Sequence, residues 1–323
     1  MAKVNNAIGI EYNSHKLRAV ELTKGVDGDY SVTSFNEKDI PSGVFSGGLI
    51  TDPVMFSHTL AEFLSESKIK TTNPAVIGVN NENVIMRYAT FPKVPDDKLR
   101  GVIMVQAQDF IPVPLNELNL DFVVIDEAKD DDDQPVVNVL LVGARNTMLD
   151  NVISNFEQSK LEVVDVDSSV LAWCRAAIEK AGEEEVLGFF KLTDDILNFV
   201  AIENKEIKMV RSINIPDRAS VEVKKVFEES DTVIEPEIDT VVEFLSGELS
   251  SSVSYYQMQN NSLVNSILFS ADTPLQSKLL EKLSERAFIP VSIPNFYGEY
   301  MTSDFNPAEY AGCISLAKVA LEG

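Results

Sequence analysis

Alternating hydrophobic and polar positions open the chain and predict three consecutive strands. Apolar residues fill positions 7–10 and then alternate with polar ones over 17–22 and 30–35, with glycines in the turn before the third segment. Period-two alternation interrupted by turn residues is typical of an antiparallel meander. The same pattern recurs in the middle of the chain, over 186–192, 196–202 and 208–215. A meander that occurs twice predicts an α/β fold with two similar halves.

Between the two meanders, a segment with a different pattern predicts a small α+β subdomain. Strand-like stretches alternate there with two amphipathic helical stretches, and the acidic run 126–134 predicts a solvated hairpin tip. We therefore expect four subdomains, with a last helix at 307–321 that packs back on the first of them. Their expected ranges are 1–82, 83–166, 167–216 together with 262–323, and 217–261.

Helix boundaries follow from capping residues and from apolar spacing. Asp52 before a proline predicts an N-cap, and Asp165 and Asp167 are predicted to cap the helix that follows them. Apolar residues near 3.6-residue spacing predict a long helix over 240–259. The acidic, polar stretch 230–237 before it is predicted to be a surface loop.

Composition narrows the classes of partner. The chain has 323 residues, 45% of them hydrophobic, and a formal net charge of −24. Such a charge opposes binding to nucleic acid phosphates and direct docking on anionic lipid. Cys174, Cys313 and the single tryptophan, Trp173, lie in apolar helical segments and are predicted core residues. Two cysteines and two histidines predict neither a disulfide framework nor a transition-metal site.

No signal for secretion or membrane spanning is found in the sequence. The first six residues lack an apolar signal-peptide core, and no apolar run approaches about 18 residues. We therefore expect residence in the cytoplasm.

Several short motifs, taken with the order of the segments, resemble one family along nearly the whole chain. They are Gly9-Ile10-Glu11, the stretch Val84–Arg87 through Phe91-Pro92, the run Gln106–Pro114, and Glu248, Ser252, Tyr255 and Tyr256 in the long helix. These resemble the PilM family of type IV pilus assembly proteins, relatives of the cell-division protein FtsA. The resemblance implies an actin-like fold, with two RNase H-like domains and a PilM/FtsA-type insertion subdomain.

The family resemblance also implies a partner. PilM-type proteins bind the N-terminal cytoplasmic peptide of a PilN-like membrane protein, in a groove between the first subdomain and the insertion. Arg87, Phe110, Ile111 and Pro112 are the residues we expect to line or position that groove. The protein would then be peripheral to the inner membrane through this partner, and the pilus motor ATPase or platform protein is a further expected partner.

ATP with Mg²⁺ is the cofactor that the resemblance implies, and here the sequence departs from the family pattern. The first phosphate turn should carry Asp and Gly, because backbone N–H groups must approach phosphate closely. It carries Glu11, Asn13 and Ser14 instead. The second turn has Thr193 followed by two aspartates, and the glycine-rich adenosine turn is replaced by Ala271 and Asp272.

Like charge and added side chains oppose a triphosphate at these positions. We therefore expect a scaffold with a degenerate nucleotide site, no bound cofactor, no catalytic residues and no metal. Two alternatives remain open: an active actin-like ATPase of the same system, and an FtsA-like filament linked to the membrane. The filament needs a C-terminal amphipathic anchor. Because the chain ends directly after its last predicted helix, we expect no such anchor.

Overall fold

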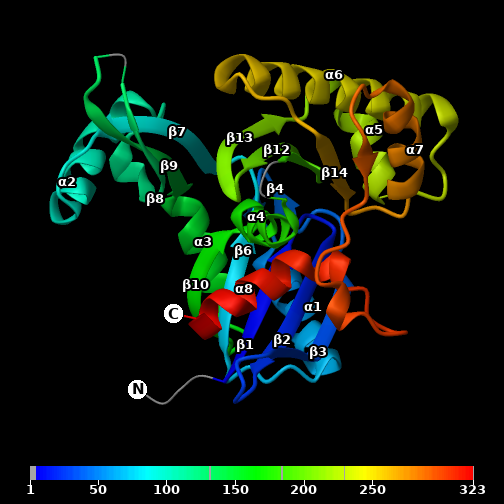
Figure 1. Cartoon of the computed structure of the whole chain (residues 1–323). Coiled ribbons are helices and arrows are strands. Elements are labelled where there is room, and N and C mark those ends of the chain that lie inside the picture. The colour runs from blue at the N-terminus through cyan, green and yellow to red at the C-terminus, as the bar shows by residue number, and fades with distance from the viewer. Residues whose placement is uncertain (1–4, 131, 183–184, 229, 323) are drawn as a thin grey trace.

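Two five-stranded sheets with the same topology form the framework (Figure 1). The computed structural model describes residues 5–130, 132–182, 185–228 and 230–322. In each sheet an antiparallel meander is extended by two strands parallel to its first strand. The first sheet has the order β10 (Glu162–Ser168), β6 (Pro74–Val79), β1 (Asn6–Tyr12), β2 (Lys16–Lys24) and β3 (Tyr30–Asp39). The second has the order β13 (Glu206–Asn214), β12 (Ile196–Glu203), β11 (Val186–Leu192), β14 (Ser266–Ala271) and β15 (Val291–Ser292).

The repeated sheet confirms the predicted α/β fold with two similar halves. Because β10 pairs with β6, the chain has returned to the first sheet by Glu162, four residues before the expected end of the insertion at 166. A short hairpin, β4 (Phe45–Ser46) and β5 (Leu49–Ile50), precedes β6.

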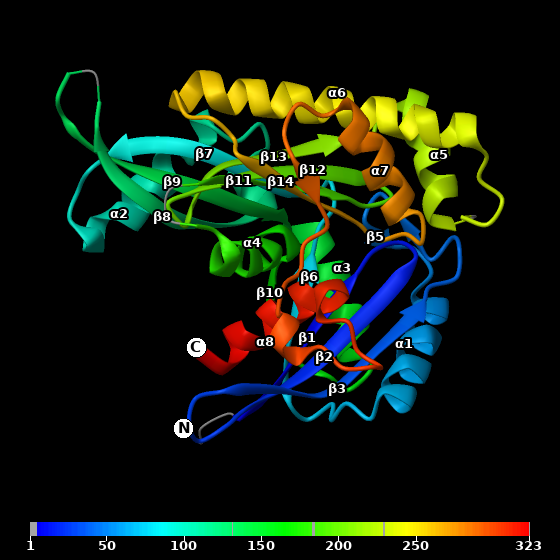
Figure 2. The same ribbon diagram turned by 45° about the vertical axis from the view of Figure 1, so that its right-hand side comes forward.

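The insertion is a three-stranded antiparallel sheet covered by a helix. Its order is β7 (Val84–Pro92), β9 (Pro135–Arg145) and β8 (Leu118–Lys129), so β7 and β8 are its edge strands. Helix α2 (Asp96–Gln106) covers one face, and α3 (Asn146–Glu157) leads back to the first sheet. The hairpin tip between β8 and β9 extends away from both domains, as Figures 1 and 2 show. Asp131 of the acidic run lies outside the described residues.

Helices cover the faces of both sheets (Figure 2). The first domain carries α1 (Pro53–Ser67), α4 (Ser169–Lys180) and α8 (Ala311–Glu322), and the second carries α5 (Asp217–Glu228), α6 (Glu235–Asn260) and α7 (Gln276–Arg286). Helix α8 lies directly against β1: a Cβ added to Gly9 would lie 1.8 Å from the carbonyl oxygen of Cys313. Only glycine permits this approach.

Capping explains where the helices begin. Asp52 caps α1 as predicted, because its Oδ1 accepts the Met55 N–H at 2.9 Å. The long helix begins at Glu235, so the predicted loop over 230–237 is wrong for its last three residues. The Glu237 carboxylate accepts the Ile234 N–H at 3.0 Å and extends the helix toward its N-terminus.

The cap predicted for α4 is also wrong. Ser168 itself caps the helix and accepts the Leu171 N–H at 3.4 Å. Asp167 instead forms an ion pair with Arg175, and Asp165 accepts the N–H of Val166 at 2.8 Å.

Candidate functional site

The cleft between the two domains collects all five residues predicted to mark the degenerate nucleotide site. They come from the ends of strands β1 and β14 and from the β1–β2 and β11–β12 loops. The five residues are Glu11, Asn13, Ser14, Thr193 and Ala271.

The first loop uses its own side chain to occupy its backbone donors. Asn13 Oδ1 accepts the N–H of His15 at 2.9 Å and that of Lys16 at 2.7 Å. This arrangement is an Asx turn, which differs from the glycine-lined phosphate turn that the family resemblance implies. Ser14 Oγ lies 3.1 Å from the His15 ring. These two backbone N–H groups are therefore already hydrogen-bonded within the loop.

Glu11 is enclosed by side chains from other elements. Trp173, on α4, donates its indole N–H to Glu11 Oε1 at 2.9 Å. On the other side lies α8, where a Cβ added to Gly312 would lie 2.1 Å from Glu11 Oε2. Burial raises the pKa of Glu11, and the nearby charge of Lys191 only partly offsets this. The carboxylate therefore has no open space for a hydrated metal ion.

Lys191 is a functional-site residue that the sequence reading assigned no role. Its buried ammonium lies 3.8 Å from the centroid of the Trp173 ring, a cation–π contact. Burial lowers the pKa of Lys191, while Asp272 and Glu11 act in the opposite direction. Trp173 is only 3% exposed, which confirms the predicted core position. Its indole N–H contacts Glu11 and its ring face contacts Lys191. The only sequence signal was a lysine inside an otherwise apolar strand.

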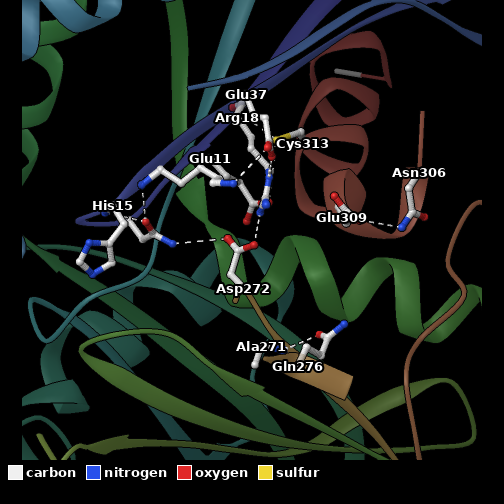
Figure 3. Close-up of polar contacts among 12 residues, drawn as sticks. Glu11, His15, Arg18, Glu37, Ala271, Asp272, Gln276, Asn306, Glu309 and Cys313 are labelled. Atoms are coloured by element: carbon white, nitrogen blue, oxygen red, sulfur yellow. Dashed lines mark hydrogen bonds and ion pairs between the residues drawn. The ribbon is translucent and has the colours of Figure 1, made fainter. Parts of the chain in front are cut away.

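Asp272 and Arg18 form an ion pair across the cleft (Figure 3). Arg18 lies on β2 of the first domain, and Asp272 directly follows β14 of the second. Arg18 Nε also donates to Glu37 Oε2 at 3.0 Å, and Asn13 Nδ2 donates to Asp272 Oδ2 at 3.4 Å. Burial raises the pKa of Asp272, but Arg18 and Lys191 outweigh it and hold that pKa below its usual value. From the sequence we expect Asp272 to repel phosphate, but nothing in the sequence indicates that Arg18 pairs with it.

We call Glu11, Arg18, Trp173, Lys191 and Asp272 the cleft cluster. Its members come from both domains. The cavity inside it, which Thr193 also lines, measures about 30 Å³. That is about the share of one water molecule in the liquid, whereas ligand sites measure roughly 300–1,000 Å³. The space inside the cleft cluster is therefore too small for a triphosphate.

Two larger cavities flank the cleft cluster. One of about 340 Å³ is lined by Ser14, His15, Asp194 and Asp195, and one of about 250 Å³ by Arg18, Asp272 and Gln276. The turn after β14 is the one that the family resemblance assigns to adenosine. It is held by an internal hydrogen bond, because the Ala271 N–H donates to Gln276 Oε1 at 2.7 Å (Figure 3).

A second interdomain ion pair lines the larger cavity. His15 Nε2 lies 3.0 Å from Asp194 Oδ2 and 3.9 Å from Glu228 Oε1. Burial lowers the pKa of His15, but the hydrogen bond and charge of Asp194, with the charges of Glu228 and Asp195, raise it overall. Partial enclosure and the Asp194 charge raise the pKa of Asp195 to about 7, although Thr193 donates to it at 2.9 Å.

The four residues expected at the partner groove do not come together. Ile111 is 2% exposed in the core of the insertion, so it has no surface to offer a peptide. Phe110 is 37% exposed and packs against Phe91 at 5.2 Å between ring centroids, beside exposed Pro112. Arg87 lines a cavity between the insertion and the second domain, not one beside the first subdomain.

The described residues contain neither a membrane-spanning helix nor a cluster of metal ligands. No helix there combines the length and the apolar character needed to cross a bilayer. No group of three or more His, Cys, Asp or Glu side chains is arranged to hold a metal ion in that part of the chain.

Solved structures that resemble the chain include the following three. One, described as a PilM–PilN type IV pilus biogenesis complex, matches with a TM-score of 0.83 at 18% identity, over 99% of this chain and 100% of that one. The ethanolamine utilization protein EutJ from Carboxydothermus hydrogenoformans matches at 0.53 and 13% identity, over 98% and 90%. The cytoplasmic domain of EpsL, from the type II secretion system of Vibrio cholerae, matches at 0.50 and 10% identity, over 98% and 95%. These likenesses confirm the actin-like fold.

A family model described as type IV pilus assembly protein PilM matches residues 9–215, which include most of the first domain, the insertion and the second meander. The chain belongs to the PilM family of type IV pilus assembly proteins.

Proposed function

We propose that this protein is a cytoplasmic scaffold of type IV pilus assembly, which binds the N-terminal tail of a PilN-like membrane protein without using a nucleotide. The observation that carries the nucleotide-free part is the cleft cluster. Side chains from both domains meet in this cluster and leave about 30 Å³ inside it. The ion pair of Arg18 and Asp272 already satisfies the charges that a phosphate and its metal would otherwise meet.

Support for the partner comes from the family and from one solved relative, described as a complex of PilM with PilN. We place the docking site for the tail where the insertion meets the first domain. Edge strand β8 of the insertion and edge strand β10 of the first sheet both carry exposed valines there. Val123 is 47% exposed on β8, and Val164 is 52% exposed on β10. Exposed edge strands with apolar side chains are suited to an extended peptide.

Charge indicates which kind of tail fits. Burial raises the pKa of Asp165 on β10, and the charges of Asp167 and of Asp121 on β8 raise it further. Asp121 and Asp165 are therefore close enough to repel one another, and a cation between them would relieve that repulsion. A short tail with basic and apolar residues suits this surface. Membrane association then comes through the partner, and the motor ATPase or platform protein remains a further expected partner.

The test is a titration of a fluorescently labelled N-terminal peptide of the neighbouring PilN-like protein into the full chain, read by anisotropy. We expect saturable binding that is unchanged by ATP with Mg²⁺. Val164→Arg should weaken binding by roughly tenfold or more, because the new arginine would repel the basic residues of the tail and because an apolar contact is lost. Val105→Arg is the matched control, since Val105 is 80% exposed on α2 of the same insertion.

Absence of saturable binding at high micromolar peptide would reject the proposed partner. Equal binding by Val164→Arg and wild type would retain the partner but reject the docking site.

A further inference from the structure

A second groove lies on the opposite edge of the insertion, against the second domain. It encloses about 540 Å³ between edge strand β7, edge strand β13 and the C-terminal half of α6. Figure 1 shows that end of α6 above β13 and beside the insertion. The lining residues are Met86, Arg87, Tyr88, Met209, Val210, Arg211, Ser212, Ser251 and Tyr255.

The side chains that line this groove carry a charge opposite to that of the whole protein. Acidic residues outnumber basic ones 51 to 27 along the chain, but none of the nine lining residues is acidic and two are arginines, of eight in the sequence. Arg87 is exposed and donates to the Met86 carbonyl at 2.8 Å, and no carboxylate of the described residues lies within ion-pair distance of it. The groove therefore offers an uncompensated cation to a ligand.

A second guanidinium is fixed in place beside the first. Arg211 donates from Nη1 to Ser252 Oγ at 2.8 Å, and its Nη2 lies 3.1 Å from Glu248 Oε2. Because a guanidinium has five N–H donors and this one is 38% exposed, donors remain for a ligand. Glu248 and Ser252 belong to the family-like motif of the long helix, and this contact gives them a structural role.

Exposed aromatic and sulfur-containing side chains flank the two arginines. Tyr88 on β7 is 37% exposed, and Tyr255 on α6 is 56% exposed. One turn beyond, Met258 is 83% exposed. Tyrosine, arginine and methionine are the residue types enriched at protein–protein interfaces, and tyrosine and arginine dominate their binding energy. Tyr88 and Tyr255 supply apolar contact next to the cationic pair.

The walls of the groove are tied together before any ligand arrives. Lys208 on β13 donates to Asp126 on β8 and to Glu206, each at 2.6 Å. This ion pair joins the insertion to the second domain close to the groove. A preformed groove reduces the ordering cost of binding.

We propose that the groove between β7, β13 and α6 binds an extended acidic segment of a partner protein. Its carboxylates would pair with Arg87 and Arg211, and an apolar side chain would pack between Tyr88 and Tyr255. Two arginines on a protein of net charge −24 suit the few carboxylates of a short segment better than the repeated phosphates of a nucleic acid. This groove uses β7, whereas the PilN-like tail is placed at β8, so the protein would hold two partners on opposite edges of one sheet.

The experiment selects peptides from a phage-displayed random linear library on the immobilised full chain. The most enriched peptide is synthesised together with an isosteric form in which each Asp and Glu becomes Asn or Gln, and both are titrated by fluorescence anisotropy. We expect acidic peptides, with roughly tenfold or more weaker binding by the isosteric form and by Arg87→Glu. Arg286→Glu, the same charge change at an exposed position on α7, should bind like wild type.

Several outcomes would overturn this proposal. They are a selection without enrichment, enriched peptides that are neutral or basic, and equal binding by Arg87→Glu. A fluorescent single-stranded oligonucleotide that binds wild type but not Arg87→Glu would assign the groove to nucleic acid instead. The PilN-like tail should bind Arg87→Glu as it binds wild type, so the two proposals fail independently.

Discussion

Arg18 and Asp272 face each other across the interdomain cleft and form an ion pair, although 254 residues separate them in the sequence. Arg18 is 11% exposed and Asp272 is 18% exposed. The pair lies among the residues that the family resemblance assigns to the nucleotide site. It joins the two domains through side chains.

Removing one member of this pair should destabilise the protein. Asp272→Ala leaves the Arg18 guanidinium with Glu37 alone, and Arg18→Ala leaves Asp272 beside Asn13 and Lys191. We expect a loss of about 2–4 kcal/mol in the free energy of unfolding for each single variant, because a largely buried charge loses its partner. Urea denaturation of both single variants and the double variant measures the coupling, expected at about 1–3 kcal/mol. A coupling of zero would show that the pair does not join the domains.

Gly312 should tolerate no side chain, because Glu11 fills the space in front of it. An added Cβ would lie 2.1 Å from Glu11 Oε2. Helix propensity alone predicts that Gly312→Ala stabilises α8, but the clash should reverse the sign and cost about 1–3 kcal/mol. The matched control is Gly247→Ala in α6, where nothing lies within 4 Å of the added Cβ. It should stabilise the protein by about 0.5–1 kcal/mol. Equal thermal shifts for the two variants would contradict the enclosure of Glu11.

The His15–Asp194 pair should make stability depend on pH. The pKa of His15 is higher in the folded protein than in the unfolded chain, so its stabilisation is present below about pH 6.5 and is lost as the pH rises through the folded pKa. We expect His15→Gln to cost about 1 kcal/mol at pH 5.5 and little at pH 9. His58→Gln, at an exposed position on α1, controls for the loss of a histidine. A cost for His15→Gln that does not change with pH would contradict the ion pair.

Trp173 gives a direct optical report on the cleft, since it is the only tryptophan in the chain. It is 3% exposed and held by Glu11 and Lys191, so acrylamide should quench its fluorescence weakly. Asp272→Ala should raise the quenching constant, because loss of the ion pair loosens the contact between the domains. Equal quenching of wild type and variant would show that the cleft stays closed without Asp272.

Much of the fold could be predicted from the sequence because it depends on local periodicity. The duplicated meander and the Asp52 cap are short-range patterns, and the structure confirms both. The start of α6 was misplaced because the Glu237–Ile234 cap lies in a stretch whose composition favours a loop. Asp165 and Asp167 were misassigned because a neighbouring serine competed successfully for the same cap.

The cleft was predicted less completely, because its chemistry depends on pairs that are distant in sequence. The sequence, through its family resemblance, predicts that Glu11, Asn13 and Ala271 replace the residues of a phosphate site. It did not show that Arg18 neutralises Asp272 or that Lys191 stacks on Trp173, since nothing local connects these residues. The residues predicted to line the partner groove lie apart for a similar reason. Arg87 and Ile111 belong to one subdomain, but Arg87 faces the second domain and Ile111 lies in the core of the insertion.

The most direct test of the central claim is a calorimetric titration of ATP with Mg²⁺ into the purified full chain, with the PilN-like tail peptide as the positive control. The cleft cluster predicts no saturable heat from ATP up to about 1 mM, and saturable heat from the peptide in the same buffer. Saturable ATP binding that is lost in Glu11→Ala would contradict the account, because it would place a nucleotide where the structure has Arg18, Asp272, Trp173 and Lys191.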